Sequence, residues 1–351
     1  MALRLSNGQG NPNSRKAQSA PNHTLPSYRH AFIQSDIREV FTFRRPPSIQ
    51  ATTPNLFHMK SLSLVCTLFL IATTSTLASL KLGIMETAFG NRAMVESVAL
   101  TKKAGLSGVQ IHTGVPDEAG LITLSKPDVI EAFRAARKEY DVEIVSLCAG
   151  EMNKHNSWDP EERAIALSIG RQSIQACKAL NVPILLVPFF GKAEFGNDIN
   201  SPKLKAAISL LRELLPHAES AGVTLGIETL TKQPAINHIL ATLNSPYLKS
   251  YYDTGNQLRV GEDAYQVIQD WGQDTICQMH LKPYNAEENG NIFGRGETDL
   301  PRLASAIHAS GYQGWLVFEA GPGKKTLGFP YAVENIKGAR KLLKEIPEAA
   351  P

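Results

Sequence analysis

Four side chains of the kinds that bind divalent cations or move protons occur where apolar stretches give way to polar sequence. Glu228 lies in VTLGIETL, Asp253 in LKSYYDTGN, His280 in ICQMHLKP and Glu319 in GWLVFEAG. An ionised carboxylate is costly to bury without a cation or a proton partner. Carboxylates packed together also raise one another's pKa, and a divalent cation removes that conflict. The pattern therefore favours a metal centre.

The donor types indicate which metal such a centre would take. One imidazole and three carboxylates with open positions suit Mn²⁺, Mg²⁺ or Co²⁺ rather than a structural zinc ion. Each residue alone also has an ordinary explanation: an exposed strand end for Glu228, a turn or helix cap for Asp253, a core histidine for His280, and a pair with a helix lysine for Glu319. The joint pattern on four successive apolar stretches favours one divalent metal ion held by all four.

These stretches belong to an alternation of apolar and amphipathic segments that begins at Lys81. The apolar segments are continuous runs, typical of strands buried on both faces of a parallel sheet. The predicted strands cover residues 80–85, 108–114, 142–150, 182–190, 223–230, 248–256, 276–283 and 314–321. The predicted helices cover residues 93–104, 127–140, 160–180, 202–221, 235–243, 263–271, 300–310 and 331–345.

Eight strand–helix pairs predict a single-domain (β/α)8 TIM barrel over residues 79–351, a fold that typically takes about 250 residues. Glycine directly after predicted helices, as in Ala104-Gly105 and Ala221-Gly222, supports the count. An open doubly wound sheet is the alternative, and it should show a glycine-rich phosphate-binding turn after an early strand. METAFGN, after the first predicted strand, is no such turn. In a barrel the strand exits converge on one face, which would bring the four side chains together.

The first 78 residues differ from the rest. Residues 1–58 are rich in Ser, Pro, Asn, Gln and Arg without a sustained period, which predicts a disordered extension. Residues 59–78 have one lysine, a short apolar run and a small-residue exit, typical of a secretory signal peptide rather than a stable membrane span. We therefore expect translation to begin at Met59 and the protein to be secreted or periplasmic. An organelle transit segment or a core helix is the alternative, and without a signal the protein would be cytoplasmic.

Charge argues against a nucleic-acid partner. The chain has a net charge of +3, but residues 1–60 hold eight Lys or Arg against Asp36 and Glu39, a net of +6, so the remainder carries −3. The predicted barrel thus has no basic excess to bind nucleic acid. We expect a small-molecule partner, and whether the protein forms a homo-oligomer stays open.

The motifs resemble the xylose-isomerase-like barrel family, which includes sugar-phosphate isomerases and epimerases, ketose 3-epimerases, hydroxypyruvate isomerases and inosose dehydratases. The resemblance spans roughly residues 81–345. Its matching pieces are GIETL with Glu228, YYDTGN with Asp253, MHLKP with His280, the loop GRGETDL at 294–300, and VFEA with Glu319.

The resemblance implies a divalent-metal-dependent sugar isomerase or epimerase that works through an enediolate. The metal would polarise a ketose carbonyl, and Glu228 and Glu319 would act as an acid/base pair on opposite faces of the sugar. Asp253 and His280 would mainly hold the metal. The alternatives are a sugar or inosose dehydratase and a non-catalytic carbohydrate-binding barrel. A DNA-repair endonuclease of the same barrel would need more histidines and a basic face.

Three further residues are predicted to bind substrate. Asn256 stands at the place of the histidine in the D-x-x-H pattern that the ketose 3-epimerases resemble. Lys282 stands two residues after His280, and His112 ends VQIH. The glutamate and the arginine expected after Glu228 and after His280 are missing, which argues against a free-ketohexose 3-epimerase. Weaker candidates at other strand ends, or in a loop that could cover the site, are Glu86, Glu151, Phe189, His155 and Trp158.

Overall fold

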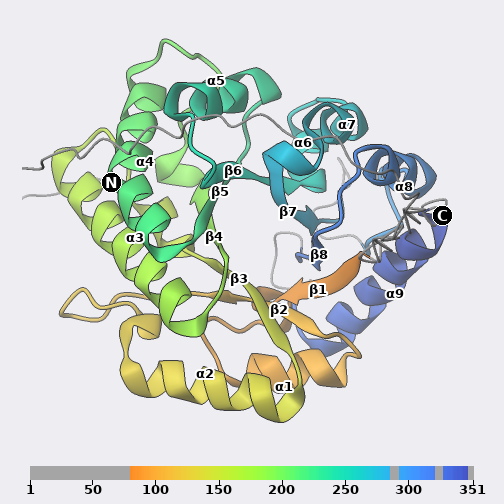
Figure 1. The fold of residues 1–351 in the computed structure, drawn as a ribbon. Helices are drawn as coiled ribbons and strands as arrows, with labels where there is room; N and C mark the ends of the chain where they lie inside the picture. Colours follow the sequence, from red (N-terminus) through yellow and green to blue (C-terminus); the bar gives the residue numbers. More distant parts are fainter. Residues whose placement is uncertain (1–79, 285–291, 321–326, 347–351) are drawn as a thin grey trace, which may run out of the picture. The chain divides into compact units, whose positions relative to one another are not determined.

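The computed structural model describes residues 80–284, 292–320 and 327–346. Eight parallel strands form a closed barrel in chain order, with β8 hydrogen-bonded to β1, and the helices lie outside the ring (Figure 1). The predicted TIM barrel is confirmed. The predicted extension and signal peptide lie outside the described residues and stay predictions. None of the described helices is long and apolar enough to cross a membrane.

The strands are β1 (Lys81–Met85), β2 (Gly108–His112), β3 (Glu143–Cys148), β4 (Ile184–Phe189), β5 (Thr224–Thr229), β6 (Leu248–Asp253), β7 (Ile276–Leu281) and β8 (Trp315–Phe318). The α-helices are α1 (Glu96–Lys103), α2 (Pro127–Tyr140), α3 (Pro160–Leu180), α4 (Pro202–Ala221), α5 (Gln233–Leu243), α6 (Thr254–Arg259), α7 (Ala264–Thr275), α8 (Leu300–Ala309) and α9 (Phe329–Glu345). Short 3-10 helices are η1 (Glu86–Phe89), η2 (Thr123–Ser125), η3 (Gly150–Lys154) and η4 (Gly191–Ala193).

Local sequence sets the ends of the long helices. Proline opens α2, α3 and α4, where its missing N–H costs no helical hydrogen bond. The Asp159 side chain caps α3 by accepting the N–H groups of Glu161 and Glu162, and Ser201 caps α4. Gly222 ends α4 in the left-handed conformation, with φ 68°. The predicted bounds of these three helices are confirmed.

Apolar side chains are buried on both faces of the barrel wall, as continuous apolar strands require. The larger cluster includes strand residues such as Ile84 and Val109 and helix residues such as Phe133 and Leu211. A second, smaller cluster consists of Met85, Val145, Cys148, Leu186, Tyr251 and Val317. This packing fixes the strands whose carboxyl ends carry the site.

Most predicted strands end earlier than expected, and β6 does so directly at the site. β6 stops at Asp253, whereas the predicted strand ran to Asn256. Asp253 is the N-cap of α6, and its Oδ1 accepts the backbone N–H of Asn256 at 2.9 Å. The cap turns the chain from strand to helix directly at the site. Asp253 therefore has the capping role that its sequence context allowed, in addition to its place among the strand-end residues.

Candidate active site

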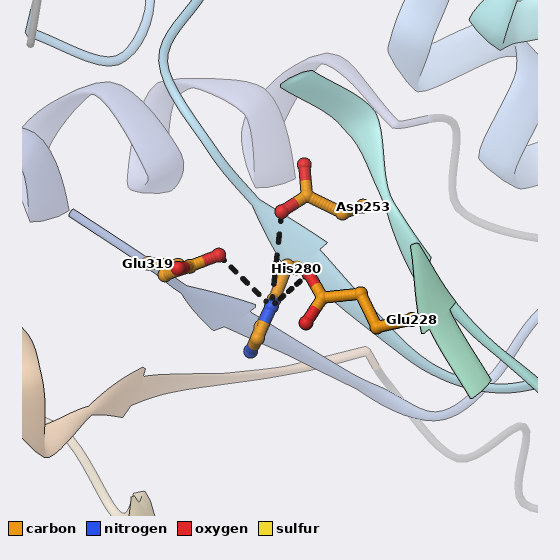
Figure 2. A group of neighbouring side chains, drawn as sticks. All are labelled: Glu228, Asp253, His280 and Glu319. Carbon is orange, nitrogen blue, oxygen red and sulfur yellow. Dashed lines mark hydrogen bonds and ion pairs between the residues drawn. The ribbon is translucent and has the colours of Figure 1, made fainter. Parts of the chain in front are cut away.

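The four predicted metal ligands meet at the carboxyl ends of β5 to β8 (Figure 2). One ligand atom from each of Glu228, Asp253, His280 and Glu319 lies within 4.8 Å of the others. Nδ1 of His280 is central: it lies 3.2 Å from Glu228 Oε1, 3.1 Å from Glu319 Oε2 and 3.8 Å from Asp253 Oδ2. We call these four residues the ligand cluster.

Strand pairing brings the cluster together. Asp253 stands directly opposite His280 in the ladder between β6 and β7. Glu319 follows β8, and its backbone N–H donates to the carbonyl oxygen of Leu281 at 3.1 Å. The side chains of Asp253 and His280 are each 1% exposed, whereas that of Glu319 is 19% exposed. The cluster therefore has an inner pair and a more accessible side.

The charges of the cluster leave room for a divalent cation. Lys282 Nζ lies 3.0 Å from Glu319 Oε2 and 3.3 Å from Asp253 Oδ2. Burial alone would lower the pKa of Lys282, but the charges of Asp253 and Glu319 outweigh burial and raise it. In the deprotonated state that binds metal, with His280 neutral, three carboxylates against one ammonium leave a charge of −2, which one divalent cation would balance.

Asp253 shows the need for a cation most directly. Its Oδ2 is buried and accepts no hydrogen bond from the described part of the chain, because Lys282 Nζ lies near it but off the direction that a hydrogen bond requires. Burial raises the pKa of Asp253 well above its ordinary range. A buried carboxylate oxygen without a donor is a suitable ligand for a hard cation. The residues present therefore fit one divalent ion held by the ligand cluster.

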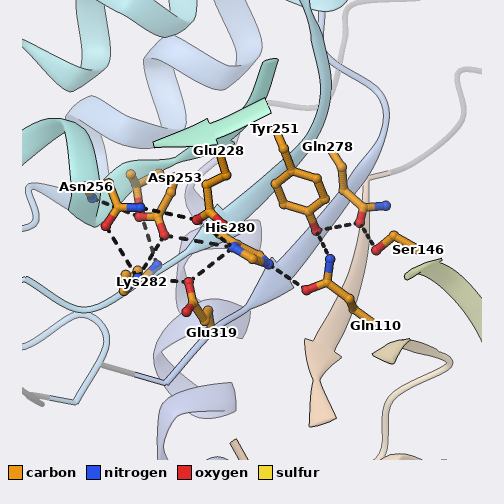
Figure 3. Close-up of polar contacts among 11 residues, drawn as sticks. Gln110, Ser146, Glu228, Tyr251, Asp253, Asn256, Gln278, His280, Lys282 and Glu319 are labelled. Carbon is orange, nitrogen blue, oxygen red and sulfur yellow. Dashed lines mark hydrogen bonds and ion pairs between the residues drawn. The ribbon is translucent and has the colours of Figure 1, made fainter. Parts of the chain in front are cut away.

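A chain of buried polar side chains lies behind His280 in the barrel interior (Figure 3). His280 Nε2 lies 2.8 Å from Gln110 Oε1, and Gln110 Nε2 donates to the Tyr251 hydroxyl at 3.0 Å. The Tyr251 and Ser146 hydroxyls donate to Gln278 Oε1 at 2.6 and 2.5 Å. An amide oxygen only accepts, so Nε2 carries a proton. Nδ1 is thereby left as the nitrogen that can bind a cation.

A proton competes with a cation for Nδ1. Burial alone would lower the pKa of His280, but Glu228 and Glu319 raise it to about 10. Metal binding at this nitrogen must therefore release a proton.

The sequence analysis did not identify Gln110 and Gln278. Each stands two residues before a site histidine, Gln110 before His112 and Gln278 before His280. Alternate residues of a strand share a face, so a polar residue two positions before a strand-end ligand points to the same side of the barrel wall. This spacing of two residues is the sequence signal from which Gln110 and Gln278 could have been found.

Asn256 and Lys282 contact the cluster. Asn256 Nδ2 donates to Glu228 Oε1 at 3.2 Å, and its Oδ1 accepts from Lys282 Nζ at 3.4 Å. Neither residue is among the described residues that line the pocket. Substrate contact by either residue stays a prediction, while their contacts in the structure position the carboxylates.

A pocket of about 460 Å³ opens beside the cluster. Glu228, Glu319, Ala320 and Leu327 contribute to its lining. The other lining residues come from the loops and ends of β1 to β4, with polar side chains from Thr87, Asn91, Arg92, His112 and Asn153. The predicted site residue His112 is therefore at the pocket, and Arg92 is a lining residue that sequence analysis did not identify.

Two of the weaker candidates from the sequence, Glu86 and Phe189, are not among the described residues that line the pocket. Glu86 is fully buried, and its carboxylate accepts the N–H groups of Ala93 and His112 at 2.6 and 2.7 Å, so it anchors the loop after β1. Phe189 packs in the core, edge-on to Phe195.

The named residues of the two loops that sequence analysis singled out are also not among the described residues that line the pocket. Trp158 lies under Lys203 Nζ at 4.7 Å, and neither Trp158 nor His155 lines the pocket formed by the described residues. In GRGETDL, Arg295 pairs with Glu334 of α9 at 2.9 Å, and Asp299 caps α8. GRGETDL thus connects helices.

The barrel and its cluster define an α/β-barrel protein with a carboxylate–histidine centre at the strand exits. The chain belongs to the xylose isomerase-like TIM barrel family, whose sequence model matches residues 98–346. The resemblance seen in the motifs is confirmed. Over 218 residues, the chain is 23% identical to a 2-epi-5-epi-valiolone 7-phosphate 2-epimerase of Actinoplanes sp., covering 61% of this chain and 77% of that protein.

Solved structures share the fold. A 3-keto-D-glucoside 4-epimerase from E. coli matches with a TM-score of 0.57 and 18% identity, covering 75% of this chain and 100% of that one. An IOLI protein described with a binding zinc atom matches with a TM-score of 0.60 and 16% identity, covering 77% of this chain and 100% of that one.

Proposed function

We propose that the protein is a divalent-metal-dependent sugar isomerase or epimerase in which Glu228 and Glu319 are the acid/base pair. One observation carries the proposal: of the four cluster residues, the two glutamates line the pocket, while Asp253 and His280 do not. The similarity to proteins named as a 2-epi-5-epi-valiolone 7-phosphate 2-epimerase and a 3-keto-D-glucoside 4-epimerase supports a sugar or sugar-like substrate. The inner pair would mainly hold the metal.

The proposed reaction is a proton transfer between carbon and the two glutamates. A bound cation would polarise the substrate carbonyl and make the neighbouring C–H acidic. Glu228 and Glu319 reach the pocket from different strands. One removes the proton to give an enediolate, and the other returns a proton. Return to the same carbon from the other face gives an epimer. Return to the neighbouring carbon, with the hydroxyl proton passing to the former carbonyl oxygen, gives an isomer.

Neighbouring side chains prepare the glutamates for this role. Lys282 Nζ donates to Glu319 Oε2 at 3.0 Å, and Asn256 donates to Glu228 Oε1. Burial alone would raise the pKa of Glu319, but Lys282 and His280 lower it below its ordinary range. Glu319 is therefore ionised at neutral pH, as a base must be.

Proton exchange in D₂O tests the proposal. Metal-loaded protein is incubated with a panel of ketoses, 3-keto sugars and inososes and followed by NMR. We expect deuterium at the carbon next to the carbonyl, together with a new epimer or isomer. Loss of water with a new enone or diketone would instead indicate a dehydratase, and no exchange with any compound would indicate a binding protein.

Two variants test the acid/base roles. Glu228→Gln and Glu319→Gln should each slow exchange by about 100-fold or more while the fold stays intact by circular dichroism. Glu213→Gln is the control, because Glu213 lies on α4 and pairs with Arg163. Full exchange activity in both active-site variants would exclude the proposed pair.

A further inference from the structure

We propose that the pocket contains an anion subsite formed by Arg92 and His112, which line it together with Glu228 and Glu319 of the ligand cluster. The substrate would then be a sugar derivative with a carboxylate or phosphate at the end remote from the reacting carbon. This inference rests on the proposed function and narrows its substrate class.

His112 offers a hydrogen-bond donor that has no partner among the described residues. Its Nδ1 accepts the backbone N–H of Gly114 at 3.0 Å, so Nε2 carries the proton of the neutral ring. Within the described ranges no acceptor contacts Nε2, although the residue is only 2% exposed and lines the pocket. Burial, reinforced by the charge of Arg92, lowers the pKa of His112 to about 4, so the ring is neutral at pH 7.

Gly150 makes space for this ring. A Cβ atom at Gly150 would lie 2.2 Å from His112 Nε2, far inside contact distance. Both residues line the pocket. The glycine therefore lets the imidazole nitrogen reach the pocket wall, and the backbone of η3 lies close against it.

Arg92 supplies positive charge beside His112. Its contact among the described residues is a single 3.5 Å approach to Glu151 Oε1, which leaves most of its five N–H donors available. Lys154 Nζ lies 2.6 Å from the other oxygen of Glu151. Glu151 pairs with both cations, and the buried Glu86 lies beside His112, so an anion would be held by the available guanidinium donors of Arg92 rather than by a net positive charge.

The loop that carries Arg92 is anchored on buried groups. Glu86 accepts the backbone N–H groups of Ala93 and Met94 at 2.6 and 3.2 Å. Asn91 donates to the Ser97 hydroxyl at 3.0 Å, and Ser97 in turn donates to Glu86. An anchored backbone reduces the entropy lost when Arg92 binds a ligand.

The donor set favours an oxygen-rich anion. A guanidinium and a neutral N–H donor bind the oxygens of carboxylate or phosphate well, and the amides of Asn91 and Asn153 lie in the same lining. A sugar that spans the pocket would present its carbonyl to the ligand cluster and its anionic end to Arg92. Sugar acids and sugar phosphates share this chemistry.

Binding of unreactive probes tests the subsite separately from catalysis. D-Glucitol, D-gluconate and D-glucitol 6-phosphate share a polyol chain and lack the ketone or aldehyde that isomerisation needs. Their affinities for metal-loaded protein are measured by calorimetry. We expect at least one anionic probe to bind about tenfold or more tightly than D-glucitol. A preference for gluconate indicates a sugar acid, and a preference for the phosphate indicates a sugar phosphate.

Matched variants identify the residue responsible for the preference for an anionic probe. Arg92→Gln should remove the preference for the anionic probe and leave D-glucitol binding unchanged. Arg171→Gln should keep the preference, because Arg171 is a half-exposed arginine of α3 whose guanidinium lies 3.9 Å from Glu213. Equal binding of all three probes would overturn the subsite. A preference retained in Arg92→Gln would also overturn it, because the anion would then bind elsewhere.

The inference and the proposed function can fail independently. An anion preference that depends on Arg92, without proton exchange on any carbonyl sugar, would support the subsite and contradict the isomerase. Exchange without an anion preference would support the isomerase and contradict the subsite.

Discussion

At the scale of single residues, the site depends on the orientation of His280. Its Nδ1 faces three carboxylates, and its Nε2 lies 2.8 Å from the Gln110 amide oxygen. Gln110 is itself fixed by its contact with Tyr251 at 3.0 Å. Because outer partners of a ligand histidine fix its ring and its tautomer, Gln110 should control metal affinity without touching the metal.

Substitution of Gln110 tests this positioning role. Gln110→Met keeps a similar volume and removes the acceptor, and we expect Mn²⁺ affinity to fall by about 10-fold to 100-fold. Gln110→Glu retains an acceptor and should therefore keep most of the Mn²⁺ affinity of the wild type. Calorimetry gives the affinity, and ¹⁵N NMR of the histidine rings gives the tautomer of His280. An unchanged affinity and tautomer in the Met variant would contradict the role.

Some residues of the site could be predicted from the sequence, and others could not. Glu228, Asp253, His280 and Glu319 were predicted to meet because strand exits converge in a barrel, and they do. Arg92 could not be predicted, because its place depends on a loop held by Glu86 through contacts that no short motif records. The prediction of Glu86 as a pocket residue was wrong, because its carboxylate accepts backbone N–H groups inside the fold. No short motif records these contacts either.

At the scale of elements, glycines mark where backbones touch. A Cβ atom at Gly338 of α9 would lie 1.9 Å from the carbonyl oxygen of Phe293. The backbone N–H of Phe293 donates to Asn335 Oδ1, also of α9, at 2.7 Å. Helix α9 therefore packs directly on the segment that precedes α8.

The Gly338→Ala substitution should push helix α9 away from the segment that precedes α8. Overpacking against a backbone oxygen costs about 1–3 kcal/mol, more than the gain in helix propensity of roughly 1 kcal/mol. We expect a lower free energy of unfolding in urea. Gly170→Ala in α3 is the control, because its Cβ would meet only the end of the Leu214 side chain, at 2.9 Å, which can move. Equal stability of the two variants would exclude tight backbone packing at Gly338.

Element bounds were predictable where local chemistry sets them. The predicted ends of α2, α3 and α4 agree because proline, capping side chains and a left-handed residue terminate these helices. The predicted strand 248–256 ran too far, because the carboxylate of Asp253 caps a helix of only six residues. Such a short helix shows no amphipathic period from which it could be predicted.

At the scale of the whole molecule, burial of His112 links stability to pH. The folded pKa of about 4 lies below the ordinary value of 6.5, so the unfolded chain binds the proton more tightly. Stability from this residue is complete above pH 6.5 and is lost as the pH falls toward 4. Charged groups near the ring are Arg92, Lys154 and Glu151, and the carboxylate of Glu86 accepts the backbone N–H of His112.

A pH series tests this linkage. In metal-free protein, the free energy of unfolding should fall by about 2 kcal/mol more between pH 7 and pH 5 in the wild type than in His112→Gln. The difference between the two proteins isolates His112 from other titrating groups. The same pH dependence in both proteins would show that His112 is not held neutral by burial.

The central claim is that four strand-end side chains hold one divalent cation. The most direct test is the metal content of protein loaded with Mn²⁺, freed of excess ion by gel filtration and measured by mass spectrometry. Asp253→Asn is the key variant, because asparagine can still cap α6 while the charge is removed. We predict one ion per chain in the wild type and a large loss in Asp253→Asn and His280→Ala. No bound ion in the wild type, or full occupancy in both variants, would contradict the claim.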